Sequence, residues 1–134
     1  MSNFQIFTDG GSRGNPGEGA IGVAIFEGEK QVEAFGERIG VTTNNIAEYT
    51  AVLRALEVVN QKYDPKKIDF MIDSELVVRQ LNGIYKIKNE NLKKIYDQIV
   101  VEIRKSGANI SFAHIRREKN KKADSLVNEA LDKG

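Results

Sequence analysis

Four acidic residues stand at similar places in the sequence, each where one element of secondary structure is expected to end or begin. Asp9 and Asp73 end two apolar stretches, while Glu48 and Asp124 lie close to the expected starts of two helices. In an open α/β sheet, functional groups gather where strands end and helices begin. Carboxylates alone suit Mg²⁺ or Mn²⁺ better than zinc or copper. If the four acids converge, they are suited to hold two Mg²⁺ ions, with Mn²⁺ as a substitute, as in phosphodiester hydrolysis.

Each acid taken singly has a structural alternative, because an acid near a helix start commonly caps the helix or interacts with its dipole. Asp73 precedes Ser74 and Asp124 follows Ala123, so both fit that alternative. Four carboxylates that met without a cation would repel one another, and several would take up protons. A shared site for the four acids therefore implies a bound cation.

The segment that follows Asp9, residues 10–17, is rich in glycine and polar side chains. Glycine permits positive φ angles and lets a bulky partner approach the backbone. We expect Asp9 to end a strand and residues 10–17 to form an open loop at a binding site; the alternative is a plain hairpin turn. The glycine spacing does not match a dinucleotide-binding fingerprint, and the P-loop tripeptide Gly-Lys-Ser/Thr is missing. We therefore expect no organic cofactor.

The pattern of apolar residues predicts an α/β domain with a five-stranded mixed sheet flanked by helices. Three antiparallel strands come first, and two parallel strands separated by helices follow. The expected strands are residues 3–9, 20–26, 31–40, 68–72 and 110–115. The expected helices run from a cluster of cap residues at 42–45 to about 62, over 74–81, over 90–105, and from the end of a basic loop at 116–122.

The composition predicts one globular domain of residues 1–134, because 40% of the residues are hydrophobic and 29% are charged. The net charge of +1 means that any basic surface for nucleic acid must be local. The sequence has no cysteine, which excludes disulfides, a thiolate zinc site and a cysteine nucleophile. No segment has the pattern of a leader peptide or a membrane span. We expect a cytoplasmic protein without membrane contact, and we expect it to be a monomer.

Four sequence segments, in this order, closely resemble motifs of the type 1 ribonuclease H family. They are TDGGSRGNPG around Asp9, TTNNIAEYTA around Glu48, IDSELV around Asp73 and REKNKKAD ending at Asp124. The resemblance covers nearly the whole chain and implies the ribonuclease H fold, with these four acids as catalytic and metal-binding residues. It also implies hydrolysis of the RNA strand of an RNA–DNA hybrid with two Mg²⁺ ions, leaving 3′-hydroxyl and 5′-phosphate ends.

Polar groups near the acids are candidates for binding the hybrid, because an enzyme that selects RNA must detect its 2′-hydroxyl groups. The candidates are Gly10, Gly11, Ser12, Arg13, Asn15, Asn44, Asn45 and Ser74. The resemblance implies that the glycine-rich segment faces the RNA strand and that Asn44 and Asn45 lie on the nucleic-acid surface. Helix capping is the alternative for these two asparagines.

Two residues compete for the place of an auxiliary catalytic residue, which in many bacterial members is a histidine in the loop before the fourth acid. His114 lies at that place when it is counted back from Asp124 without gaps, but it falls within an expected strand. Alignment on Asn120 and Asp124 places Arg117 in the loop instead, as in archaeal-like members. We therefore predict Arg117 as the auxiliary catalytic residue and His114 as a strand or interface residue.

The sequence departs from the bacterial pattern of the family near the substrate. Glu75 stands where many members have glutamine, and an acid there would repel a phosphate. The connector at 84–89 leaves no room for the basic protrusion of many members. A cluster of basic residues supplies a candidate phosphate-facing edge: Arg104, Lys105, Arg116, Arg117, Lys119, Lys121 and Lys122. A solvated helix face is the alternative for the last two.

Two other functions fit the same motifs. One is a non-catalytic module that binds hybrids or other nucleic acids, and the other is a nuclease of this fold with broader substrates, such as double-stranded RNA. The complete set of four acids favours an enzyme, because a module that only binds has little reason to hold four carboxylates that repel one another.

Overall fold

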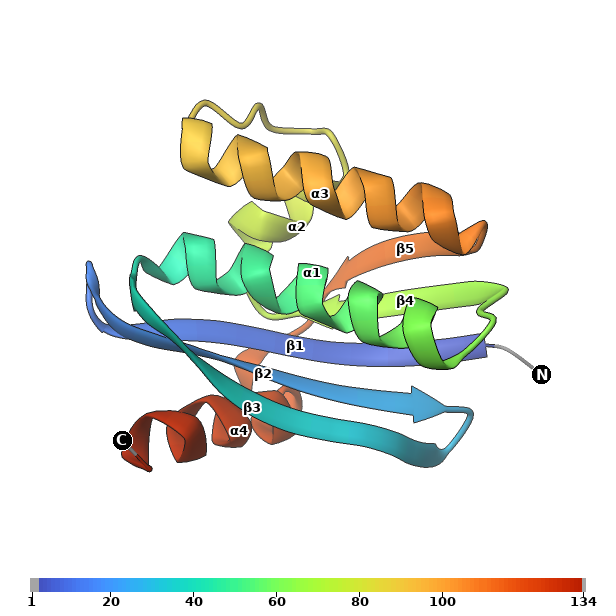
Figure 1. Cartoon of the computed structure of the whole chain (residues 1–134), viewed down its shortest axis with the longest axis horizontal. Coiled ribbons are helices and arrows are strands. Elements are labelled where there is room, and N and C mark those ends of the chain that lie inside the picture. Colours follow the sequence, from blue (N-terminus) through green and yellow to red (C-terminus); the bar gives the residue numbers. More distant parts are fainter. Residues whose placement is uncertain (1–2, 134) are drawn as a thin grey trace.

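A five-stranded sheet in the order β3-β2-β1-β4-β5 forms the centre of the computed structural model, which describes residues 3–133 (Figure 1). The strands are β1 (Asn3–Gly14), β2 (Gly17–Glu27), β3 (Lys30–Thr42), β4 (Lys67–Ile72) and β5 (Asn109–His114). The helices are α1 (Asn44–Lys62), α2 (Glu75–Leu81), α3 (Glu90–Ser106) and α4 (Lys121–Asp132), with a 3₁₀ turn, η1, at Arg117–Lys119. β1, β2 and β3 are antiparallel, whereas β4 and β5 run parallel to β1 and to each other. The predicted mixed sheet is confirmed.

Helices cover both faces of the sheet (Figure 1). α1 packs against β1 and β2 with α3 on its outer side, and α4 packs on the other face against β2 and β3. The core side of α1 carries an apolar stripe at helical spacing, of which Tyr49, Val52 and Leu56 are fully buried. Within residues 3–133, no helix has both the length and the hydropathy that a membrane span requires.

β1 does not end at Asp9, so the expectation of an open loop over residues 10–17 is wrong. β1 continues to Gly14 and pairs with β2 as far as Gly17, which leaves a tight hairpin turn at Asn15 and Pro16. Glycine disfavours strands and marks turns, but the hydrogen bonds of the β1–β2 ladder hold this segment extended. The pairing of β1 with β4 does stop at Thr8. Asp9 therefore lies at the end of the parallel part of the sheet, although not at the end of its strand.

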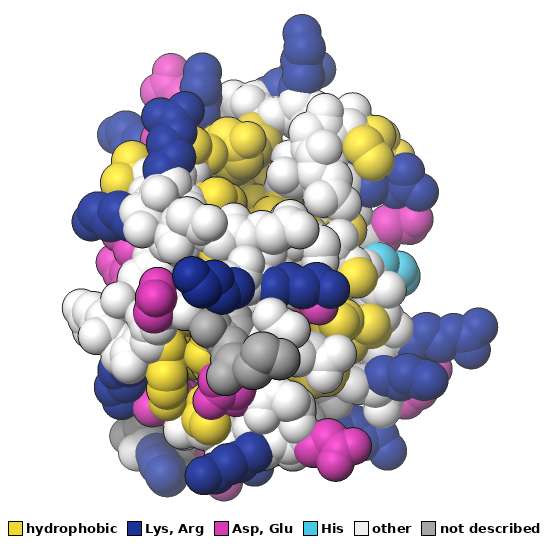
Figure 2. Space-filling model, turned by 90° about the vertical axis from the view of Figure 1, so that its right-hand side faces the viewer, with side chains coloured by type: hydrophobic (Ala, Val, Ile, Leu, Met, Phe, Trp, Pro, Cys, Tyr) yellow, Lys and Arg dark blue, Asp and Glu magenta, His cyan; other side chains and the backbone are white. Residues whose placement is uncertain are grey.

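Charged side chains of both signs are interspersed on the face that carries the N-terminal end of β1 (Figure 2). Ion pairs join charged side chains of the fold, for example Lys62 with Glu33 at 3.0 Å and Lys67 with Asp69 at 3.8 Å. Exposed pairs of this kind contribute about 0–1 kcal/mol each. They balance the surface charge, in agreement with the net charge of +1, and leave the stability of the fold to its apolar core.

Gly10 lets β1 and α1 approach each other closely. A Cβ atom at position 10 would lie 2.3 Å from the carbonyl carbon of Ala47 and 2.5 Å from the backbone nitrogen of Glu48. These are backbone atoms, so only a movement of the helix could relieve the clash. The close contact places Glu48 beside the residue that precedes Gly10, which is Asp9.

We expect Gly10→Ala to lower the free energy of unfolding by about 2 kcal/mol, because the added methyl group overpacks the interface between β1 and α1. Urea denaturation measures the loss. Gly11→Ala is the matched control, since its Cβ would lie 3.8 Å from the side chain of Val127, which is an ordinary contact. Equal losses in the two variants would contradict the close approach at Gly10.

Candidate active site

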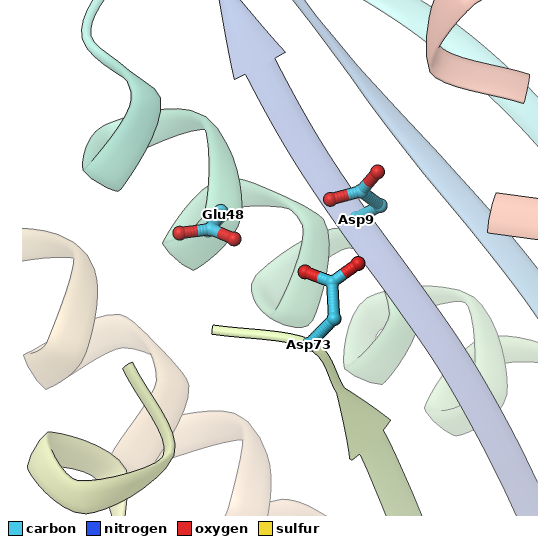
Figure 3. Close-up of side chains that lie close together, drawn as sticks. All are labelled: Asp9, Glu48 and Asp73. Carbon is cyan, nitrogen blue, oxygen red and sulfur yellow. The ribbon is translucent and has the colours of Figure 1, made fainter. Parts of the chain in front are cut away.

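Three acidic side chains converge where β1, α1 and β4 meet (Figure 3). Asp9 projects from β1, Glu48 from α1, and Asp73 directly follows β4. One oxygen from each carboxylate lies within 4.8 Å of the other two. Oxygen ligands about 2.1 Å from a Mg²⁺ ion are themselves about 3 to 4.2 Å apart. The spacing and the oxygen-only chemistry of this group therefore fit a divalent metal ion.

Neighbouring residues, not these acids, cap the helices beside the cluster. Thr43 is the N-cap of α1 and accepts a hydrogen bond from the backbone nitrogen of Ile46 at 3.3 Å. Ser74 is the N-cap of α2 and accepts one from Val77 at 3.3 Å. Asp73 is therefore not the N-cap of α2, and the capping alternative for it is wrong.

Asp124 lies outside the group of three but lines the same cavity. It comes from the first turn of α4, which lies on the opposite face of the sheet from α1. An acid in the first turn of a helix also interacts favourably with the helix dipole. Its negative charge raises the pKa of Asp9. The structure thus brings the fourth acid within electrostatic reach of the cluster from a different layer of the fold.

Burial and mutual repulsion raise the pKa of two of the acids into the neutral range. Burial, followed by the charges of Asp73 and Asp124, raises the pKa of Asp9 to about 7, although a hydrogen bond from the backbone of Gly10 opposes the rise. Burial, followed by the charges of Asp9 and Asp73, raises the pKa of Glu48 to about 8. A divalent cation would stabilise the ionised carboxylates and displace these protons.

A cavity of 480 Å³ surrounds the acids and contains most of the predicted substrate-binding residues. Those in its lining are Gly10, Gly11, Ser12, Arg13, Asn44 and Ser74. Asn15 and Asn45 instead line a neighbouring groove, together with Asn89 and Asn91 at the start of α3. The predicted substrate-binding residues are therefore divided between the cavity and the groove beside it.

Asn44 joins the β1–β2 hairpin to the start of α1. Its Oδ1 accepts hydrogen bonds from the backbone nitrogen of Ser12 at 2.9 Å and from the Ser12 hydroxyl at 3.1 Å. The backbone nitrogen of Asn44 donates to Oδ1 of Asn15 at 3.1 Å. Since Thr43 is the N-cap, the capping alternative does not hold for Asn44 or Asn45. These bonds hold the glycine-rich hairpin beside the cluster of acids.

Arg117 and His114 occupy different surroundings. Arg117 lies in the 3₁₀ turn η1 and lines the cavity, and its positive charge acts to lower the pKa of Glu48. His114 is the last residue of β5, as its sequence pattern predicts, and is outside the cavity lining. The structure places the guanidinium group, not the imidazole ring, next to the acids.

Glu75 forms an ion pair with Arg79 one helical turn further along α2, at 3.0 Å. The Arg79 guanidinium also lies over the ring of Tyr85, 5.6 Å from its centre. The positive charge of Arg79 therefore partly offsets the repulsion that Glu75 would exert on a nearby phosphate.

The contact that Asn120 makes with the acids was not predicted from the sequence, where the residue served only to align the loop with the family. The side chain is buried, and its amide nitrogen donates to the carbonyl oxygen of Thr8 at 2.9 Å and to Oδ2 of Asp73 at 3.2 Å. An asparagine just before a helix is commonly an exposed cap, so its type and position did not reveal this contact. The signal in the sequence that could have indicated a role for Asn120 is its place in the REKNKKAD motif.

We expect the metal-free protein to become less stable as pH rises from about 4 to about 8. Carboxyl groups in an unfolded chain titrate near pH 4, whereas the folded pKa values of Asp9 and Glu48 are about 7 and about 8. Between these limits the folded state binds more protons than the unfolded state, so the free energy of unfolding falls with rising pH. Urea denaturation in chelator at several pH values measures the slope.

Asp9→Asn is the control for this pH dependence. It removes one titrating group and also the charge that raises the pKa of Glu48, so the variant should show a smaller fall in stability between pH 4 and pH 8. An identical slope in the variant and the wild type would contradict the assigned cause.

Comparisons with known proteins agree with this geometry over nearly the whole chain. A family model described as "Reverse transcriptase-like" matches residues 7–130. Ribonuclease HI of Halobacterium salinarum is 37% identical over 129 residues, which cover 96% of this chain and 64% of that protein. A bifunctional protein of Mycobacterium tuberculosis is 33% identical over 129 residues, which cover 95% of this chain and 35% of that protein. The chain therefore spans less than two thirds of the length of these two relatives.

The solved structure of LC11-RNase H1 in complex with an RNA/DNA hybrid has the same fold. It matches with a TM-score of 0.93 and 44% sequence identity, and the match covers 98% of each chain. That protein was isolated from compost by a metagenomic approach. The shared fold, the extent of the sequence match and the convergent acids lead to one conclusion: the chain belongs to the type 1 ribonuclease H family.

Proposed function

We propose that this protein is a metal-dependent endoribonuclease that hydrolyses the RNA strand of RNA–DNA hybrids and leaves 3′-hydroxyl and 5′-phosphate ends. The observation that carries the proposal is the convergence of Asp9, Glu48 and Asp73 in a cavity that Asp124 also lines. The choice of substrate is supported by the similarity to LC11-RNase H1, whose structure was determined with an RNA/DNA hybrid.

The metal of this enzyme is, in our proposal, a pair of Mg²⁺ ions that the four acids hold, with Mn²⁺ as a substitute. Ions of this kind lower the pKa of an attacking water and stabilise the leaving oxygen in phosphodiester hydrolysis. The acids come from β1, from α1 and α4, which pack against β1 from opposite faces of the sheet, and from the end of β4. Ligands on such rigid elements keep their positions before the metal binds.

The polar residues around the acids would bind the hybrid. Gly10 and Gly11 line the cavity and would face the RNA strand, and Ser12, Asn44 and Ser74 offer hydroxyl and amide groups to its 2′-hydroxyls. Arg13 and Arg117 offer positive charge to phosphates. Asn15 and Asn45, in the neighbouring groove, would extend the contact along the duplex.

The active unit in this proposal is one ribonuclease H domain of residues 1–134 that works as a monomer in the cytoplasm. The support for a monomer is that a single chain supplies all four acids to one cavity. The cysteine-free sequence suits a reducing compartment.

Cleavage assays test the proposed substrate and metal. We expect the purified protein to cut only the RNA strand of an end-labelled RNA–DNA hybrid in Mg²⁺ or Mn²⁺, and to be inactive in chelator. Duplex RNA and duplex DNA are the control substrates. Binding of the hybrid without cleavage in either metal would favour the non-catalytic module, and cleavage of duplex RNA would favour the broader nuclease.

Asp9→Asn should reduce kcat by more than about 100-fold, because it removes a charged ligand from the centre of the cluster, and losing even an indirect partner of a metal ligand costs about 10- to 100-fold. The fold should persist, since the substitution relieves repulsion among the acids. Circular dichroism checks the fold, and single-turnover cleavage of the hybrid checks the chemical step. Full activity of this variant would refute the proposed metal site.

Arg117→Ala should reduce kcat at least about tenfold, because it removes a positive charge from the cavity in which negative charge develops during hydrolysis. His114→Ala, at the exposed end of β5 and outside the cavity, is the matched control and should change kcat less than twofold. The reverse pattern, a large loss for His114→Ala alone, would assign the auxiliary role to the histidine.

A further inference from the structure

Asn120 lies between the two segments that bring Arg117 and Asp124 to the cavity. Its backbone nitrogen donates to the carbonyl oxygen of Arg117 at 2.9 Å, and its own carbonyl oxygen accepts from the backbone nitrogen of Asp124 at 3.1 Å. The residue is 1% exposed, although both segments around it are largely open to solvent. A polar side chain with so little contact with water must find its hydrogen-bond partners within the protein.

The side-chain amide of Asn120 connects the ends of the two parallel strands at the centre of the sheet. The pairing of β1 with β4 stops at Thr8 and Ile72, and Asp73 is the next residue of the chain. The amide nitrogen of Asn120 donates to the Thr8 carbonyl oxygen at 2.9 Å and to Oδ2 of Asp73 at 3.2 Å. A carbonyl oxygen and a carboxylate oxygen accept hydrogen bonds, so the amide nitrogen of Asn120 faces Thr8 and Asp73, and it has one hydrogen for each of them.

This arrangement restrains the carboxylate of Asp73. A carboxylate on a short side chain can otherwise rotate among several orientations, and only some of these point toward Asp9 and Glu48. The bond from Asn120 selects one orientation and ties it to the backbone of β1, which carries Asp9 one residue after Thr8. The same residue holds the start of α4, so the restraint also extends to Asp124.

We propose that Asn120 is a positioning residue that orients Asp73 for metal binding and links that orientation to the placement of Asp9 and Asp124. This inference rests on the proposed metal-dependent activity. Asn120 itself does not touch the substrate; it acts through the carboxylate that it holds. Loss of such an outer partner typically weakens metal binding or activity by about 10- to 100-fold.

Asn60 provides an unusually close control within the same chain. Its amide nitrogen also donates to a backbone carbonyl and to a carboxylate, those of Glu102, at 2.9 Å and 3.0 Å. The Oδ1 atoms of Asn60 and Asn120 are both buried without a hydrogen-bond partner. Asn60 joins α1 to α3 and lies 12 residues beyond Glu48 in α1, or about 18 Å along the helix. If Asn120 had a purely structural role, its substitution should therefore change stability and Mn²⁺ affinity in the same way as substitution of Asn60.

The test compares Asn120→Ala and Asn120→Ser with Asn60→Ala. Serine is favoured at a helix N-cap, which is the position of Asn120 in α4, but its side chain is too short to reach both Thr8 and Asp73. Asn120→Ser thus keeps the start of the helix if the alanine variant fails to fold. Isothermal titration calorimetry measures the Mn²⁺ dissociation constant, urea denaturation in chelator measures stability, and steady-state cleavage of the hybrid gives kcat and KM.

We expect the Asn120 variants to bind Mn²⁺ at least tenfold more weakly than the wild type and to have a lower kcat, with KM for the hybrid changed less than twofold. Asn60→Ala should unfold at a lower urea concentration but keep its Mn²⁺ affinity and kcat within twofold. Mn²⁺ affinity within twofold of the wild type in the Asn120 variants, or an equal loss in Asn60→Ala, would overturn the proposal. A wild type that binds Mn²⁺ but leaves the hybrid intact would refute the proposed function, while the affinity comparison would still decide the role of Asn120.

Discussion

The repulsion among carboxylates held close together in a partly buried place is the constraint on which the rest of this structure depends. Burial removes water that would otherwise screen the charges, and together with the neighbouring acids it raises the pKa of Asp9 to about 7 and that of Glu48 to about 8. The mutual repulsion of the ionised acids opposes this arrangement when no cation is bound. The hydrophobic core must therefore hold them together, and metal binding would then relieve the stored repulsion.

The core meets this requirement by placing the acids on elements that cannot move apart independently. α1 lies so close to β1 that a single methyl group at Gly10 would meet the backbone of Ala47 and Glu48. β4 is hydrogen-bonded to β1 up to the residue before Asp73. Asn120 then connects the ends of both strands to the start of α4. Each of these three contacts fixes the distance between two elements that carry acids. The fold therefore holds the acids together even without a metal.

The hairpin of β1 and β2 shows how the lining of a cavity can be built from regular structure. Its glycines are typical of a loop, yet the β1–β2 ladder keeps them extended as far as Gly14, and Asn44 holds Ser12 against the start of α1. A paired strand presents its backbone in a defined position, whereas a free loop would lose conformational entropy on binding. At Gly10 the glycine thus serves the close approach to α1 and not flexibility.

The sequence by itself determined the local features of this protein: the apolar stripe of α1, the order and type of the strands and helices, and the identity of the four acids. These follow from periodicity and residue type, which act over a few residues. Only the tertiary structure decided that β1 continues past Asp9, that Asp124 reaches the cavity from the opposite face of the sheet from α1, and that Asn120 contacts Asp73. Those outcomes depend on strand pairing and on distances between residues far apart in the chain. Local propensity carries no information about such distances, because they are set by how the whole core packs.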